Sequence, residues 1–175
     1  MPVYVALLRA INVGGTGKLA MSDLRALCEA AGFDDVATYI QSGNVVFSSR
    51  SGRAEVQRRL EAALAAKVGK PVGVHLRTPA ELASVLERNP FSDVPGSQVL
   101  VLFLDHAPAP GALDDLVIPG RETVRLSGQE VFVHFPDGMG RSKLKIPFAK
   151  TATGRNVNTV AKLLELGSRA GGGKR

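Results

Sequence analysis

The stretch Val3-Tyr-Val-Ala-Leu-Leu8 decides the predicted fold, because it lacks charged and strongly polar residues at every position. It is too short for a buried helix, and its valines and leucines favour a strand. A strand with one face in water would alternate polar and apolar residues. Since this strand is apolar on both faces, it predicts a sheet that is covered on both sides.

The first half of the chain continues outward from this strand with alternating helical and strand patterns. Apolar residues recur at i, i+3, i+4 and i+7 after a cap at residues 22–23, which predicts an amphipathic helix that ends at Gly32. Two short runs around a tight turn at residues 41–44 predict a hairpin. The resulting order, β-α-β-β-α-β, is the split βαβ arrangement of ferredoxin-like folds. The predicted strands are residues 3–8, 36–40, 45–48 and 72–77, and the second helix is residues 53–68.

The second half repeats most of this order. The capping box Thr78-Pro-Ala-Glu81 predicts a connecting helix that ends at Pro90. Ser127-Gly128 predicts the turn of a second hairpin. The β-α-β-β-α order of this half indicates a structural duplication. Its predicted elements are strands at residues 99–104, 123–126 and 131–135, a short helical segment at 112–116, and a helix at 156–166 that is closed by Gly167.

The predicted fold class is therefore α+β, with two ferredoxin-like halves packed together and the last strand of the second half missing or reduced. Element order alone carries the inference of duplication, because the two halves show no matching residues. The predicted domains are residues 1–77 (the first ferredoxin-like half), 78–97 (a connecting helix and loop), 98–167 (the second half) and 168–175 (a disordered, glycine-rich tail).

Composition predicts an ordinary globular protein of the cytoplasm. No apolar run approaches the roughly 20 residues that a membrane helix needs, and the N-terminal residues lack the pattern of a secretory signal. Cys28 is the single cysteine and cannot form an internal disulfide, which agrees with a reducing compartment. Because Cys28 falls on the apolar stripe of the first helix, we expect a packed core thiol rather than a reactive one.

Positive charge is concentrated in one segment. The formal net charge is +6, yet residues 78–138 hold nine Asp/Glu and three Lys/Arg, whereas residues 139–175 hold one Asp/Glu and nine Lys/Arg. Such a regional excess of cations favours an anionic partner. The stretch from Met139 to Arg155 contains no acidic residue, and its cations are Arg141, Lys143, Lys145, Lys150 and Arg155.

Four motifs together resemble one bacterial family, the domain-of-unknown-function family numbered 1697. That family's pattern typically has glycine where Ala10 stands and a bulkier residue, often tryptophan, where Val157 stands. The resemblance implies an α+β protein of two ferredoxin-like halves and no established activity. The motifs are Ala6-Leu-Leu-Arg-Ala-Ile-Asn-Val-Gly-Gly15, Thr38-Tyr-Ile-Gln-Ser-Gly-Asn-Val-Val-Phe47, Phe135-Pro-Asp-Gly-Met-Gly-Arg-Ser-Lys-Leu144 and Gly154-Arg-Asn-Val-Asn-Thr159.

The candidate ligand site combines the cations with the motif loops. Backbone N–H groups at the predicted helix start, with Arg155 adjacent, would form an anion site. Alternatively, Asn156 or Asn158 merely caps the helix, and both interpretations can hold together. The resemblance places Arg9, Asn12, Ser42 and Asn44 in the same set of loops, and it leaves open whether these face Arg141. The predicted ligand-binding residues are Arg9, Asn12, Lys18, Ser42, Asn44, Arg141, Ser142, Lys143, Arg155 and Asn156.

The glycine-rich loop at residues 14–18 is predicted to be a simple connection. It fails as a P-loop, because Asn12 stands in place of the first glycine and Leu19 in place of the Ser/Thr. A dinucleotide site is disfavoured, because the next predicted strand is not the parallel partner that a Rossmann unit requires. Lys18 and Arg9 could still help to hold an anion.

Other catalytic patterns are weak. Ser142-Lys-Leu-Lys145 matches S-x-x-K, the serine nucleophile motif of penicillin-binding enzymes, but its companion motifs are missing. Asp137 is assigned to a turn before Gly138 rather than to general-base work. The sequence predicts no cofactor and no metal site, and it leaves catalysis open. The three histidines, His75, His106 and His134, show no metal-ligand spacing.

Two main functions follow from these patterns. The first is binding of a small anionic ligand, phosphorylated or carboxylated, at the 9–18 and 139–158 loops. The alternative is a nucleic-acid-binding module held by phosphate contacts. Binding of RNA on a sheet face is disfavoured, because residues 42–47 lack the basic residue and the first aromatic of the RNA-recognition pattern. A protein-interaction role through the acidic middle and the basic end is a third interpretation. No membrane partner is predicted, and the oligomeric state is left open.

Overall fold

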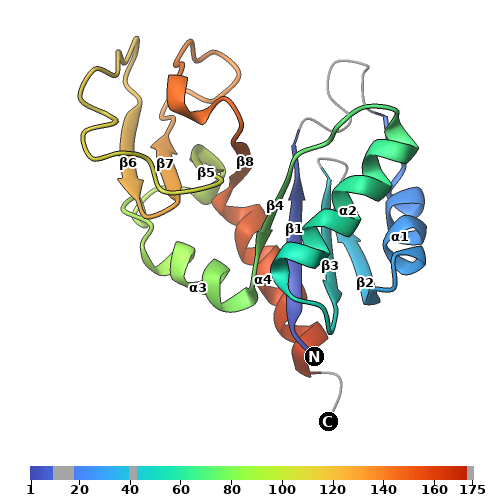
Figure 1. Cartoon of the computed structure of the whole chain (residues 1–175). Helices are drawn as coiled ribbons and strands as arrows, with labels where there is room; N and C mark the ends of the chain where they lie inside the picture. Colours follow the sequence, from blue (N-terminus) through green and yellow to red (C-terminus); the bar gives the residue numbers. More distant parts are fainter. Residues whose placement is uncertain (10–17, 40–42, 173–175) are drawn as a thin grey trace. The chain divides into compact units, whose positions relative to one another are not determined.

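The computed structural model describes residues 1–9, 18–39 and 43–172. Within these residues, four α-helices and two four-stranded antiparallel sheets form an α+β fold (Figure 1). The chain divides into two compact units, one formed by Met1–Ala83 with Lys162–Arg175 and the other by Ser84–Ala161. The division falls inside helices α3 (Pro79–Glu87) and α4 (Val157–Gly172).

The first unit contains the predicted β-α-β-β-α-β order. Its sheet has the order β2-β3-β1-β4, in which all neighbours are antiparallel. Helices α1 and α2 lie on one face of this sheet (Figure 1). The predicted order of helices and strands is therefore confirmed for this half. The elements are β1 (Val3–Leu8), α1 (Met21–Ala30), β2 (Asp34–Tyr39), β3 (Asn44–Ser48), α2 (Arg53–Val68) and β4 (Val74–Arg77).

Strand β1 is buried on both faces, as its apolar sequence predicts. Residues 4–8 are all buried, and the alternate residues Tyr4, Ala6 and Leu8 join the core that α1 and α2 cover. On the opposite face, α4 approaches closely at Gly167. A Cβ built there would lie 3.6 Å from Val5 Cγ2 and 3.0 Å from Pro79 Cγ. Glycine is thus the residue that lets this helix turn meet the strand, and the prediction that Gly167 ends the helix is wrong.

Cys28 is a core residue of α1, as predicted. It is a free thiol, it is fully buried, and it packs in the same cluster as Leu24 and Leu60. Burial, with a smaller contribution from the charge of Glu29, raises the pKa of the Cys28 thiol to about 12. The reactive thiolate form is therefore strongly disfavoured in the folded protein.

We predict that Cys28 reacts with a disulfide reagent such as 5,5′-dithiobis(2-nitrobenzoate) only when the first unit unfolds. Labelling at pH 8 should be at least about 100-fold slower in buffer than in 6 M guanidinium chloride, since both access and ionisation are suppressed. Labelling in buffer at the rate of the unfolded chain would contradict the packed-thiol assignment.

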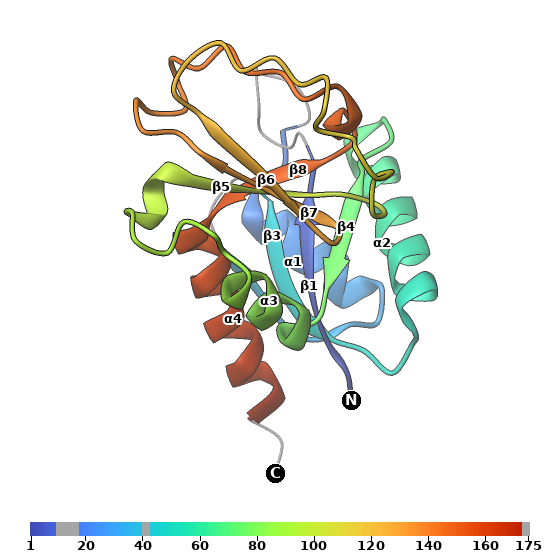
Figure 2. The same cartoon turned by 90° about the vertical axis from the view of Figure 1, so that its left-hand side faces the viewer.

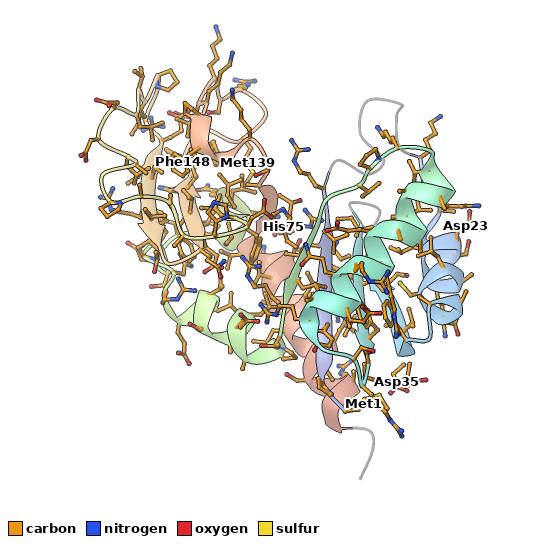
Figure 3. The ribbon with its side chains drawn as sticks, viewed as in Figure 1. Met1, Asp23, Asp35, His75, Met139 and Phe148 are labelled. Atoms are coloured by element: carbon orange, nitrogen blue, oxygen red, sulfur yellow. The ribbon has the colours of Figure 1, made fainter. Side chains whose placement is uncertain are left out.

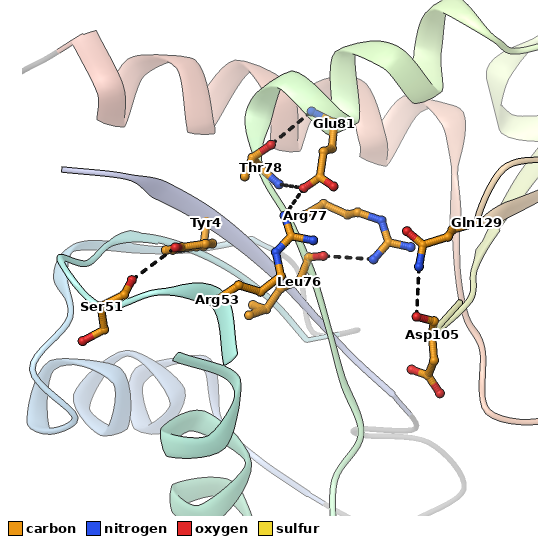
Figure 4. Close-up of polar contacts among 9 residues, drawn as sticks. All are labelled: Tyr4, Ser51, Arg53, Leu76, Arg77, Thr78, Glu81, Asp105 and Gln129. Carbon is orange, nitrogen blue, oxygen red and sulfur yellow. Dashed lines mark hydrogen bonds and ion pairs between the residues drawn. The ribbon is translucent and has the colours of Figure 1, made fainter. Parts of the chain in front are cut away.

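Helix α3 begins at the predicted capping box. The Thr78 N–H donates to Glu81 Oε1 at 2.9 Å, and the Glu81 N–H donates to Thr78 Oγ1 at 3.2 Å (Figure 4). These reciprocal bonds satisfy two backbone donors that a helix start leaves open. Pro79 occupies the first helical position, where a missing N–H costs nothing.

The second unit contains a sheet with the order β6-β7-β5-β8, again antiparallel throughout (Figure 1). The predicted hairpin at Ser127-Gly128 is confirmed as the β6–β7 connection, where Gly128 has the positive φ of 60° that favours glycine. The elements are β5 (Val99–Phe103), β6 (Thr123–Ser127), β7 (Glu130–His134) and β8 (Thr153–Asn156), with 3-10 turns at Gly96–Gln98 and Pro147–Ala149.

The structure corrects three predictions, two of which concern this half. Residues 112–116 form successive turns rather than a helix, in a loop that Pro108 and Pro110 interrupt. The last strand is not missing or reduced, because β8 has four residues, as β4 has, and pairs with β5. What is missing is the helix before it, whose place is taken by a loop. The third correction concerns the tail: disorder was predicted from residue 168 onward, but residues 168–172 belong to α4 in the first unit.

In three strands at the sheet edges, an arginine side chain donates a hydrogen bond to a backbone carbonyl. An edge strand leaves some C=O groups without a neighbouring strand, and such groups need another donor. Strands β4, β6 and β8 lie at edges, and in each an arginine Nη1 donates to the carbonyl of the preceding residue. Figure 4 shows the first of these bonds. The pairs are Arg77 with Leu76 at 2.9 Å, Arg125 with Val124 at 2.9 Å, and Arg155 with Gly154 at 2.8 Å.

Candidate anion-binding site

Two long loops of the second unit, residues 104–122 and 135–152, lie side by side at one end of its sheet (Figures 1 and 2). Two polar contacts join them. Arg121 and Asp137 form a bidentate ion pair, with Arg121 Nε 3.0 Å from Asp137 Oδ2, and Ser142 Oγ donates to Glu122 Oε1 at 2.6 Å. The second loop is therefore held against the start of β6.

Arg121 holds the pKa of the Asp137 carboxyl below its usual range, mainly through their hydrogen bonds. The Ser142 hydroxyl lowers the pKa of Glu122 in the same way. Both carboxylates are therefore charged at neutral pH, and their hydrogen bonds hold the two long loops together. These contacts support the predicted turn role of Asp137. The next residue, Gly138, has a φ of 89°, which favours glycine.

Residues 141–147, here called the basic segment, alternate between exposed and partly buried. Leu144 and Ile146 pack against the buried cluster of the second unit. Met139 and Phe148, labelled in Figure 3, flank the segment and pack against the same cluster. The cations that alternate with Leu144 and Ile146 along the segment are turned outward. These cations are Arg141, Lys143 and Lys145, and all three are exposed.

The three outward cations have no ion-pair partner within the described parts of the chain. Three like charges close together along one segment repel one another and attract an anion placed near them.

A hollow of about 290 Å³ opens beside the basic segment and is here called the lysine hollow. Two lysines of one loop line it together with apolar residues that come mainly from the other loop, and one carboxylate adds a negative charge. Its lining residues are Asp115, Leu116, Val117, Pro119, Lys143, Lys145 and Pro147.

A second, smaller hollow of about 130 Å³ lies at the start of the basic segment, where Arg141 and Ser142 line it together with Glu122 and Asp137. Glu122 Oε2 is buried and has no hydrogen-bond partner within the described residues. It lies over Gly120, where an added Cβ would come within 2.9 Å of it. Two carboxylates and one unpaired arginine make this hollow less favourable for an anion than the lysine hollow.

Arg155 and Asn156 lie in β8 and line neither hollow. Arg155 is buried, its Nη1 donates to Thr153 Oγ1 at 2.7 Å as well as to Gly154, and desolvation lowers its pKa to about 10. Asn156 Oδ1 accepts the Thr159 N–H at 2.8 Å, so Asn156 caps α4 as the structural interpretation requires. Ligand binding by these two residues stays a prediction.

Three of the predicted site residues, Arg9, Lys18 and Asn44, are described residues of the first unit. Arg9 and Lys18 are exposed, and the Arg9 side chain lies against Gly73. Asn44 is fully buried and its Nδ2 donates to the Tyr39 carbonyl at 2.9 Å, which closes the β2–β3 hairpin. Asn12 and Ser42 lie outside the described residues.

The S-x-x-K interpretation of Ser142 and Lys145 is not supported by the structure. On a helix these residues would share a face, but residues 142–145 form no helix, and Ser142 is partly buried whereas Lys145 is exposed. Ser142 instead bonds Glu122 and accepts the Leu144 N–H at 3.2 Å. Within the described ranges, no group of three or more His, Cys, Asp or Glu is placed to hold a metal ion. In the same ranges, no helix is both long and apolar enough for a membrane span.

The sequence patterns do not reveal part of the lysine hollow. They mark Lys145 only as one of several cations between Met139 and Arg155, and they do not mark Asp115 or Val117 at all. The apolar pair Val117-Ile118, in a loop rich in turn residues, is the signal that could have drawn attention to this strip. Its neighbours in space come from residues almost 30 positions later, which no spacing in the sequence reveals.

Comparisons with known proteins agree with this architecture. The solved structure of the conserved bacterial protein SP0830 from Streptococcus pneumoniae is similar, with 25% sequence identity and a TM-score of 0.79 over 94% of this chain and 98% of that one. No curated protein matches the chain. The family model described as "Protein of unknown function (DUF1697)" matches residues 1–132, which ends before the basic segment. This match covers most of the chain and includes the first two of the four motifs, so the chain belongs to the DUF1697 family, as the resemblance implied.

Proposed function

We propose that this protein binds a small anionic ligand, and that Lys143 and Lys145 are the main contacts. The observation that carries the proposal is the outward row of exposed, unpaired cations beside a hollow of about 290 Å³. That volume is near the lower end of the usual range for small-molecule sites. Packing of Leu144 and Ile146 fixes the backbone that presents the lysines, so less ordering is needed when an anion binds.

We further infer that each unit is ferredoxin-like. Both sheets have the same connectivity, since the first, second, third and fourth strands of each unit lie in the order 2-3-1-4. The single buried thiol supports a cytoplasmic location. Catalysis is not part of the proposal, because the lysine hollow contains no nucleophile paired with a base.

Nucleic-acid binding is the second candidate function, and the row of cations is the observation that favours it. A phosphate chain could follow Arg141, Lys143 and Lys145 along their common side. Two features weigh against it. The central strands β1 and β3 are buried on both faces, which is unsuitable for base stacking. Asp115 also stands in the lysine hollow and would repel a polyanion.

We predict that Lys143→Ala/Lys145→Ala weakens the binding of inorganic phosphate and acetate about tenfold. Each lysine contributes up to about 0.7 kcal/mol at an exposed site, and about 1.4 kcal/mol is a factor of ten. The measurement is an NMR chemical-shift titration of ¹⁵N-labelled protein at low ionic strength, which follows the amides of residues 115–118 and 143–146. Arg50→Ala/Lys70→Ala, which removes the same charge from exposed positions of the first unit, should change the affinity less than twofold.

Unchanged titration curves in the lysine variant, or shifts of equal size all over the surface, would contradict the proposal. The nucleic-acid alternative is tested with a 20-nucleotide single strand at 20 and 150 mM salt. Binding that falls steeply with salt and is lost in the lysine variant would favour it. Weak binding that the lysine and control variants share equally would indicate net charge alone.

A further inference from the structure

We propose that the ligand of the lysine hollow is a monoanion that carries an apolar group, such as an aromatic carboxylate. This inference rests on the proposed function, because it names the class of anion that the same site would take. What distinguishes this class of anion is the apolar group, which would contact the apolar residues that line the hollow beside the lysines.

The apolar strip is the first argument. Leu116, Val117 and Pro119 come from one loop and Pro147 from the other, and they line the hollow with the two lysines. Val117 is 77% exposed, the most exposed of the large hydrophobic side chains in the described residues. A single exposed valine is ordinary on a protein surface. An exposed valine that lines the same hollow as two unpaired lysines, together with three other apolar residues, offers an amphiphilic anion both a charged and an apolar contact.

The strip is also held in place. The Leu116 N–H donates to the Leu113 carbonyl at 3.1 Å, and both side chains pack against the buried cluster of the second unit. The next residue, Val117, is thereby presented to solvent by a fixed turn. On the other loop, Pro147 opens the 3-10 turn that follows Lys145. An apolar ring could thus be buried with little ordering of the protein.

The charge of the lining is the second argument. Two lysines and one aspartate give the lining of the hollow a formal net charge of +1. A single negative charge on the ligand would be balanced, whereas a polyphosphate or an oligonucleotide would bring further charges close to Asp115. The site therefore fits a carboxylate on an apolar body better than a multiply charged anion.

The test compares benzoate with acetate, which carry the same charged group with and without a ring. We expect benzoate to bind the wild-type protein about tenfold more tightly, because its ring would bury apolar surface against the strip. Val117→Ser should weaken benzoate binding by about threefold to fivefold and leave acetate binding unchanged. The matched control is Ile118→Ser, an exposed apolar neighbour that does not line the hollow, and it should leave both affinities unchanged.

Thermal unfolding of both serine variants would establish that they are folded, which we expect because the replaced side chains are exposed. Equal affinities for benzoate and acetate, or equal losses in Val117→Ser and Ile118→Ser, would overturn the inference. In either case the proposed function would stand if phosphate and acetate still bound through Lys143 and Lys145. If none of these anions shifted the amides of the hollow, both proposals would fail together.

Discussion

Replacement of Phe47 by alanine is expected to lower the free energy of unfolding by about 3–5 kcal/mol, the usual cost of removing a buried phenylalanine. Phe47 lies in the middle of β3 and is fully buried. Its ring stacks on Phe33 with a centroid distance of 4.3 Å, and the Tyr4 ring centroid lies 6.1 Å away on β1. The alanine variant therefore loses both the transferred apolar area and two aromatic contacts.

Urea unfolding, followed by far-UV circular dichroism, measures this effect. Phe47→Leu is the matched control, and it should cost clearly less, because it keeps most of the buried volume. The slope of the free energy against urea should stay unchanged in both variants if the cavity does not alter the compactness of either state. A loss below about 1 kcal/mol for Phe47→Ala would mean that Phe47 is not part of the packed core.

Replacement of Arg88 by alanine is expected to cost about 2–4 kcal/mol, because it leaves the buried Glu130 carboxylate without its arginine. Arg88 follows the end of α3, and its Nη2 lies 2.6 Å from Glu130 Oε1. Its Nη1 donates to both the carbonyl and the hydroxyl of Ser127 at 2.8 Å, and its Nε donates to Ser84 Oγ at 3.1 Å. The Glu130 side chain is only 5% exposed, whereas that of Arg88 is 33% exposed, which places the cost below that of a fully buried pair.

Two comparisons separate the buried pair from ordinary surface charge. Arg58→Ala removes an exposed partner of Glu55 and should leave the free energy of unfolding almost unchanged, because solvent screens the pair. Arg88→Met/Glu130→Gln removes both charges and should recover part of the loss, since the buried carboxylate is removed together with its arginine. If Arg88→Ala cost no more than Arg58→Ala, the contact of Arg88 with the β6–β7 turn would carry no stability.

Local patterns predicted much of the fold because they express short-range physical chemistry. The apolar strand at residues 3–8, the capping box at 78–81 and the hairpin turn at Gly128 each depend on neighbours in sequence. Predictions failed where tertiary contacts overrode local preference. Gly167 resembles a helix end, but it lies inside α4, where close contact with Val5 and Pro79 explains the glycine. The helix predicted from residue 156 does begin at Val157, but the strand at residues 153–156 before it was not predicted, because it forms only by pairing with β5.

The sequence by itself determined the α+β class, the order of elements in the first unit, the core position of Cys28 and the presence of a cation-rich segment. Only the tertiary structure decided which of these cations lie together. Burial of Leu144 and Ile146 turns Lys143 and Lys145 outward, and pairing of β8 with β5 takes Arg155 into the sheet. Charge is a property of each residue and can be counted along the chain. The direction in which a charge points depends on what its neighbours pack against, and those partners are distant in sequence.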